Sequence, residues 1–228
     1  MFKTRFAGAL AIVLASAGVA GAEGFPEARD EALKFTVRKK PKTWIKLESK
    51  APAETVNGKV ADLSGELMLN PAKLDSAAGT ITVPLKNLDT GNKTRNQHML
   101  SSEWMDADNY PNVELAVEAI EDVKIEKKKA EAKLKGKMKI RGVEKEVSLP
   151  VKMTYVKDKK ADGKDDTLVV SSSFEIKLAD YEIKGKAGVV GNKVAETVKL
   201  SVQIQLNSGE EPEKKSGEVK KKPPPPAL

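Results

Sequence analysis

The stretch that decides the fold of this chain is residues 81–117, ITVPLKNLDTGNKTRNQHMLSSEWMDADNYPNVELAV. Apolar residues alternate with other residues at both of its ends, at Ile81, Val83, Leu85, Val113, Leu115 and Val117. A period of two is typical of strands that bury one face. The polar connection between these two strands is too long for a hairpin turn. We therefore expect it to cross and close one end of a sheet.

The same period recurs along the chain. It predicts strands at residues 32–39, 58–69, 79–88, 112–125, 131–141, 145–156, 168–178 and 194–206, with a short further piece at 43–47. Residues 48–57 are polar and rich in turn formers, and the one helical candidate is residues 94–105. Eight or nine strands joined mostly by short turns indicate an all-β antiparallel barrel or sandwich with one short helical crossing segment. We favour the barrel, because it leaves no open sheet edge on the long lysine-rich strands. A barrel of about eight strands has a lumen that either side chains or one small ligand can fill.

The first 22 residues have the pattern of a secretory signal peptide. Lys3 and Arg5 precede an uncharged apolar run at residues 6–19, and Ala20-Gly21-Ala22 is a small-residue cleavage pattern. We expect cleavage before Glu23 and a periplasmic or secreted protein. The alternative is an uncleaved N-terminal anchor, although the apolar run is shorter than the ~20 residues that a membrane span needs.

The other end of the chain differs in composition from the strands. Residues 208–228 are rich in lysine, glutamate and proline and contain almost nothing that could enter a core, so we expect a disordered tail. The alternative is that this tail docks on a partner. Residues 23–207 remain as one domain with one core.

Charge and composition exclude several classes of protein. The formal net charge of +7 becomes 7 − 2 = +5 once Lys3 and Arg5 are removed with the signal peptide. The absence of cysteine excludes disulfides and a lipid-modified cysteine anchor. Export and the 4% aromatic content disfavour nucleic acid as a partner. The lysines at 124–141 form either a solvated outer face or a surface for weak contact with anionic membranes.

Catalytic and metal chemistry have little support in the sequence. His98 is the only histidine, which with no cysteine disfavours a zinc site. Asp106 and Asp108 begin like a calcium loop, but Pro111 stands where the turn glycine belongs. No serine lies in a GxSxG elbow, so a polar loop role for His98 is favoured over a hydrolase base. We predict no catalytic residue, no metal site and no cofactor.

Several segments, taken in order, resemble the signature of the YceI-like family of exported, lipocalin-like proteins that bind polyisoprenoid chains. The similarity extends over about residues 33–206, essentially the whole folded domain. The matching pieces are Asp62-Leu63-Ser64-Gly65, Leu88-Asp89-Thr90-Gly91-Asn92 with Arg95 and His98-Met99-Leu100, Ser101-Ser102-Glu103-Trp104-Met105 with Tyr110-Pro111, Arg141-Gly142-Val143-Glu144-Lys145 with Val147, and Leu178-Ala179-Asp180-Tyr181-Glu182-Ile183.

The resemblance implies an exported barrel that sequesters or carries a polyisoprenoid, such as a quinone-type tail, or a similar lipid. His98 and Trp104 are expected at the mouth of the lumen. Apolar residues of the predicted strands are expected to line it: Val83, Leu85, Val113, Leu115, Leu134, Met138, Leu149, Phe174 and Leu200. Two alternatives stay open, a ligand-free structural or stress-protective module that uses its tail for contacts, and a hydrolase centred on His98. No oligomeric state is predicted.

Overall fold

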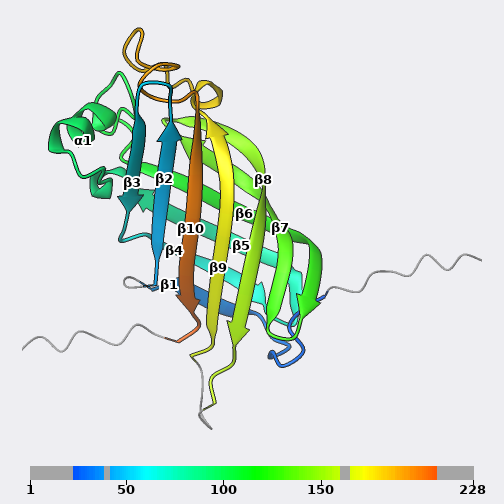
Figure 1. Cartoon of the computed structure of the whole chain (residues 1–228). Helices are drawn as coiled ribbons and strands as arrows, with labels where there is room; N and C mark the ends of the chain where they lie inside the picture. Colours follow the sequence, from blue (N-terminus) through cyan, green and yellow to red (C-terminus); the bar gives the residue numbers. More distant parts are fainter. Residues whose placement is uncertain (1–22, 39–41, 160–164, 210–228) are drawn as a thin grey trace, which may run out of the picture.

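The computed structural model describes residues 23–38, 42–159 and 165–209. Within them the chain forms ten strands, one α-helix and two short 3-10 helices (Figure 1). The strands are β1 (Leu33–Val37), β2 (Trp44–Lys50), β3 (Thr55–Val60), β4 (Ser64–Asn70), β5 (Lys73–Pro84), β6 (Asn112–Glu126), β7 (Lys129–Ile140), β8 (Val143–Val156), β9 (Thr167–Lys177) and β10 (Thr197–Asn207). The helices are η1 (Leu85–Asn87), α1 (Lys93–Leu100) and η2 (Leu178–Tyr181).

Eight of these strands close into an antiparallel barrel in the order β1-β4-β5-β6-β7-β8-β9-β10. The ring is completed where β1 pairs with β10 through Thr36 opposite Asn207 and Val37 opposite Leu206. Farther along β10, Lys199–Gln203 pair with β2 instead. β3 pairs with the other edge of β2 and is the last strand of the sheet on that side. β2 and β3 therefore extend the wall beyond the short strands β1 and β4. The predicted all-β barrel with a helical crossing segment is confirmed.

The single long strand predicted at 58–69 is wrong, because the structure divides it into β3 and β4. Asp62 lies between them with φ 57°, a left-handed conformation that interrupts a ladder. Gly65 follows with φ 140°, and a Cβ there would come 2.2 Å from the carbonyl oxygen of Thr80. The turn predicted at 48–57 is also too long, since β2 continues to Lys50 and β3 begins at Thr55.

The crossing segment begins earlier than its sequence pattern indicates. The strand predicted at 79–88 starts at Lys73 and ends at Pro84, after which Leu85–Asn87 form η1. The helix predicted at 94–105 ends at Leu100. Its start is fixed by Asn92, whose side chain accepts a hydrogen bond from the backbone N–H of Arg95 at 3.0 Å.

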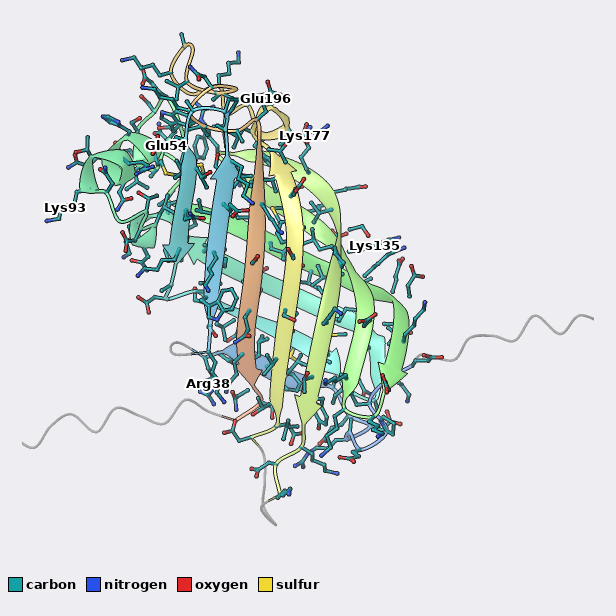
Figure 2. The ribbon with its side chains drawn as sticks, viewed as in Figure 1. Arg38, Glu54, Lys93, Lys135, Lys177 and Glu196 are labelled. Atoms are coloured by element: carbon teal, nitrogen blue, oxygen red, sulfur yellow. The ribbon has the colours of Figure 1, made fainter. Side chains whose placement is uncertain are left out.

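β7 has the clearest division between inside and outside. Its apolar positions from Ala130 to Ile140 are buried, whereas the lysines between them are on the outer surface, as the outward-pointing Lys135 in Figure 2 illustrates. Lys133, Lys135 and Lys137 each pair with an acidic residue of β6, at distances of 2.8, 2.7 and 3.7 Å. These pairs offset much of the positive charge of this face, and its contact with membranes stays a prediction.

Both predicted terminal segments lie largely outside the described residues. The signal peptide at 1–22 is outside them, as are residues 210–228 of the tail. Ser208 and Gly209 are described and bond to the loop before β9, through Asp166 and Asp165. Among the described residues, no helix is long and apolar enough to cross a membrane.

Candidate binding cavity

The barrel contains an internal cavity of about 650 Å³. Its wall is formed by inward-facing side chains of the strands together with residues of α1 and of the loops that follow α1 and η2. A volume of this size lies within the range of about 300–1,000 Å³ that is typical of ligand pockets. The lumen is therefore only partly filled by the protein's own side chains.

The structure brings all eleven sequence-predicted site residues to this one cavity. Val83, Leu85, Val113, Leu115, Leu134, Met138, Leu149, Phe174 and Leu200 lie on its wall, and His98 and Trp104 lie there with them. Leu85 reaches the wall from η1 rather than from a strand. Several of the strand residues, including Phe174 and Leu200, are only partly buried although they point inward. Such exposure is expected for apolar side chains that face unfilled space.

The end of the barrel away from α1 is closed by packed side chains. Phe25, from the segment before β1, stacks on Tyr155 with ring centroids 5.3 Å apart and is 2% exposed. This segment runs at the lower end of the barrel in Figure 1, opposite α1. Phe35 is fully buried in the same core cluster. This end is closed, and the cavity extends from the residues packed beside this cluster, such as Met153 and Leu206, to the α1 end.

A buried carboxylate anchors the closed end. Asp166 is fully buried and accepts hydrogen bonds from the Tyr155 hydroxyl at 2.6 Å, the Asp158 backbone N–H at 2.8 Å and Arg29 Nε at 3.0 Å. Burial alone would raise the pKa of Asp166, but these donors outweigh it and hold the pKa below its ordinary value. Burial, together with the bond to Asp166, also raises the pKa of the Tyr155 hydroxyl.

The opposite end forms a mouth with polar residues. Glu54 from the β2–β3 turn, Arg95 from α1, and Lys186 and Lys193 from the loop after η2 all line it. Arg95 and Glu54 form an ion pair at 2.6 Å that connects α1 to the β2–β3 turn. Figure 2 places Glu54 at this end and Lys93 on the outer side of α1. The cavity thus has an apolar interior and charged groups at its mouth.

Arg141 connects the two loops of the mouth to each other. Its Nη1 donates to the carbonyl of Glu182 at 3.3 Å, and its Nη2 donates to the carbonyl of Ser102 at 3.1 Å. Close by, Gly185 allows the ring of Trp104 to approach, because a Cβ on Gly185 would lie 2.6 Å from that ring. Trp104 is therefore held as part of the mouth and is not a freely rotating surface residue.

Among the residues that the structure describes, none forms a side-chain hydrogen bond with the imidazole of His98 that would resemble a catalytic pair. The Ser101 hydroxyl donates to the backbone carbonyl of His98 at 2.7 Å, so this contact does not involve the imidazole ring. In the described part of the chain, no cluster of three or more His, Cys, Asp or Glu residues could hold a metal. His98 lies at the cavity mouth with the other polar residues.

Some wall residues were missed at the level of sequence. Ile45, Leu47 and Ser49 alternate along β2 and reach the cavity. Ile45 and Leu47 lie in the short piece predicted at 43–47 but were not assigned to the lumen, and Ser49 lies in the stretch expected to be a turn at 48–57. Arg95, Met99 and Lys186 also line the cavity. They lie in the helix and a loop, where no period of two indicates which side chains face inward.

A closed antiparallel barrel around an apolar cavity, open at a polar mouth, defines a lipocalin-like class of domain. The YceI-like domain family matches residues 29–206, and the chain belongs to this family. A search of curated protein sequences found no match.

Solved structures share this fold. BcnA from Burkholderia cenocepacia has 22% identity and a TM-score of 0.59, covering 72% of this chain and 96% of that one. The YCEI protein of Campylobacter jejuni has 23% identity and a TM-score of 0.58, covering 71% and 90%. A polyisoprenoid-binding domain from Saccharophagus degradans, implicated in plant cell wall breakdown, has 14% identity and a TM-score of 0.58, covering 78% and 99%. At these identities the likeness establishes the fold alone.

Proposed function

We propose that this protein is an exported carrier that sequesters a polyisoprenoid or a similar lipid chain in its barrel lumen. The observation that carries the proposal is the cavity of about 650 Å³, closed at one end and walled by apolar side chains. The polyisoprenoid-binding domain of Saccharophagus degradans, which has the same fold, supports this class of ligand. No catalytic step, metal or cofactor is part of the proposal.

The physical chemistry of the wall favours a hydrocarbon chain over a polar ligand. Each CH₂ group moved from water into the lumen contributes about 0.8 kcal/mol. Polar groups of the wall are concentrated near the mouth, at Glu54, Arg95 and Lys186, whereas the strand positions deeper in the barrel are mostly Val, Leu and Ile. A chain with an apolar tail inside and a polar end at the mouth satisfies both regions.

The direct test is lipid extraction from protein purified out of an exporting host, followed by mass spectrometry. We expect a stoichiometric isoprenoid or other long-chain lipid. N-terminal sequencing of the same sample tests export, for which we expect a chain that starts at Glu23. A preparation that yields no lipid and also fails to bind added farnesol would refute the lumen as a lipid site.

A pair of neighbouring substitutions on β10 links that lipid to the lumen. Leu200→Arg introduces a charge at the cavity wall, whereas Ser201→Arg introduces the same charge at the adjacent position, which is not part of the wall. We expect the extracted lipid to fall at least tenfold for Leu200→Arg, because an unpaired charge in an apolar site is strongly unfavourable. The Ser201→Arg protein should retain its lipid. Equal loss in both variants would contradict binding in the lumen.

A further inference from the structure

The methionines of this protein are concentrated at its cavity. Of the six in the chain, five lie in the described residues. Four of them, Met99, Met105, Met138 and Met153, line the cavity. The fifth, Met68, is on the outer surface of β4 and is 45% exposed. The thioether groups thus face the site where the proposed ligand would bind.

These four methionines stand at two depths. Met138 and Met153 are buried on β7 and β8, at 5% and 1% exposure. Met99 and Met105 are partly exposed and belong to the segment that forms the mouth. They are neighbours, because the backbone N–H of Met105 donates to the carbonyl of Met99 at 3.0 Å. Among the four cavity methionines, Met99 and Met105 are therefore the first that a small oxidant from solvent reaches.

We propose that Met99 and Met105 form an oxidation site that controls lipid occupancy of the cavity. This inference rests on the proposed function. The thioether sulfur attacks one oxygen of a peroxide; the S–O bond forms, the O–O bond breaks, and water leaves. Sulfur loses two electrons and the peroxide gains them. A dithiol reductant restores the thioether by removing the oxygen as water while it becomes a disulfide.

Oxidation changes how the wall interacts with a hydrocarbon chain. A thioether is a flexible, apolar and polarizable group that packs well against irregular ligands. A sulfoxide is polar, and its oxygen needs a hydrogen-bond donor, which a hydrocarbon chain does not provide. A lipid bound over Met99 and Met105 would leave that oxygen desolvated. Oxidation is thus expected to weaken lipid binding, and bound lipid is expected to shield both sulfur atoms from the oxidant.

The test uses the delipidated mature protein, hydrogen peroxide and the neutral apolar dye N-phenylnaphthylamine. Peptide mass spectrometry measures oxidation at each methionine, and dye fluorescence measures the dissociation constant before and after treatment. We expect the dissociation constant to rise roughly tenfold once both mouth methionines are oxidised, as leaving one buried acceptor unsatisfied implies. Bound dye should slow the oxidation of Met99 and Met105, whereas the rate of oxidation of Met68 should not change.

Two variants assign the effect to its residues. The Met99→Leu/Met105→Leu protein keeps similar side-chain volumes without sulfur. Its dissociation constant for the dye should be about the same before and after peroxide treatment. The Met68→Leu protein should behave like the parent. An unchanged dissociation constant in a parent protein whose Met99 and Met105 are fully oxidised would overturn the inference while leaving the proposed function intact. A rise in the dissociation constant on peroxide treatment that persists in the Met99→Leu/Met105→Leu protein would also overturn the inference. If the dye and farnesol both fail to bind the unoxidised parent, the proposed function fails, and this inference fails with it.

Discussion

At the scale of single residues, Asp166 connects separate segments of the chain at the closed end of the barrel. It is a fully buried carboxylate whose partners come from three parts of the chain, Arg29 before β1, Tyr155 on β8, and Asp158 after β8. A buried charge is tolerated only when hydrogen bonds replace its lost water. Asp166 therefore ties the N-terminal segment, with Phe25, to the end of the barrel.

Replacing Asp166 by asparagine tests this role. Asp166→Asn keeps the shape but removes the charge that Arg29 and Tyr155 face, and we expect the free energy of unfolding at neutral pH to fall by about 2–3 kcal/mol. Because the folded-state pKa of Asp166 is lowered, its stabilisation is present above about pH 4, the value of an unperturbed aspartate. It is lost as the pH falls through the folded-state pKa.

Urea denaturation at several pH values measures both effects. The difference in the free energy of unfolding between the parent and Asp166→Asn should narrow as the pH falls below about 4. The unfolded parent then binds a proton at Asp166, whereas the folded parent does not bind it until the pH reaches the lower folded-state pKa. Asp122→Asn is the matched control, because its ion pair with Lys133 is exposed on both sides. If the difference in the free energy of unfolding does not change with pH, the charge of Asp166 is not the source of the stabilisation.

A second residue-scale prediction concerns Gly185 and the ring of Trp104. Gly185 and Gly188 share a left-handed backbone, with φ 61° and 75°, so alanine is strained at either position. Only at Gly185 would the new Cβ collide with the Trp104 ring, because nothing lies within 4 Å at Gly188. We expect Gly185→Ala to shift the fluorescence emission of Trp104 and Gly188→Ala to leave it unchanged, both measured in a Trp44→Phe background. Identical spectra would contradict the ring contact.

At the scale of elements, the mouth is an assembly of loops fastened to a rigid barrel. The turn between β7 and β8 carries Arg141, which holds the carbonyls of Ser102 and Glu182. The ion pair between Arg95 and Glu54 fastens α1 to the β2–β3 turn. α1 itself buries none of its residues. The position of α1 therefore depends on a few side-chain bonds rather than on buried side chains of its own.

Arg141→Lys isolates this fastening, because lysine keeps the charge but cannot donate in a fixed fork to two carbonyls. We expect hydrogen exchange in residues 101–105 and 178–186 to become several times faster, while β7 and β8 stay protected. Lys139→Arg, at an exposed position of β7, is the control and should leave exchange unchanged. Unaltered exchange at both loops in Arg141→Lys would mean that they are held by other contacts.

At the scale of the whole molecule, a partly filled lumen makes stability depend on occupancy. A ligand at 100 times its dissociation constant adds about 2.7 kcal/mol to the free energy of unfolding. For a domain of this size that corresponds to a rise in Tm of roughly 5–10 °C. We expect delipidated protein to melt lower by about this amount and to recover when farnesol is added in a thermal scan. A Tm that is insensitive to both treatments would contradict an open lumen.

The alternation of apolar residues predicted most strands and the lumen-facing set, because a side chain's face in a strand follows from its position alone. It failed where backbone conformation interrupts the period, as at Asp62 between β3 and β4. It also could not place Arg95, Met99 or Lys186 at the cavity. These residues lie on a helix and a loop, whose orientation is set by contacts with distant parts of the chain.

Periodicity and turn residues act locally, and they were enough to predict an antiparallel all-β fold with a crossing segment at 81–117. That the lumen is hollow, with one end closed and the α1 end forming a mouth, follows from the tertiary structure. Strand pattern specifies which side chains face inward, but not how completely they fill the space between them. That depends on the closure of β1 on β10 and on the insertion of Phe25 at one end only.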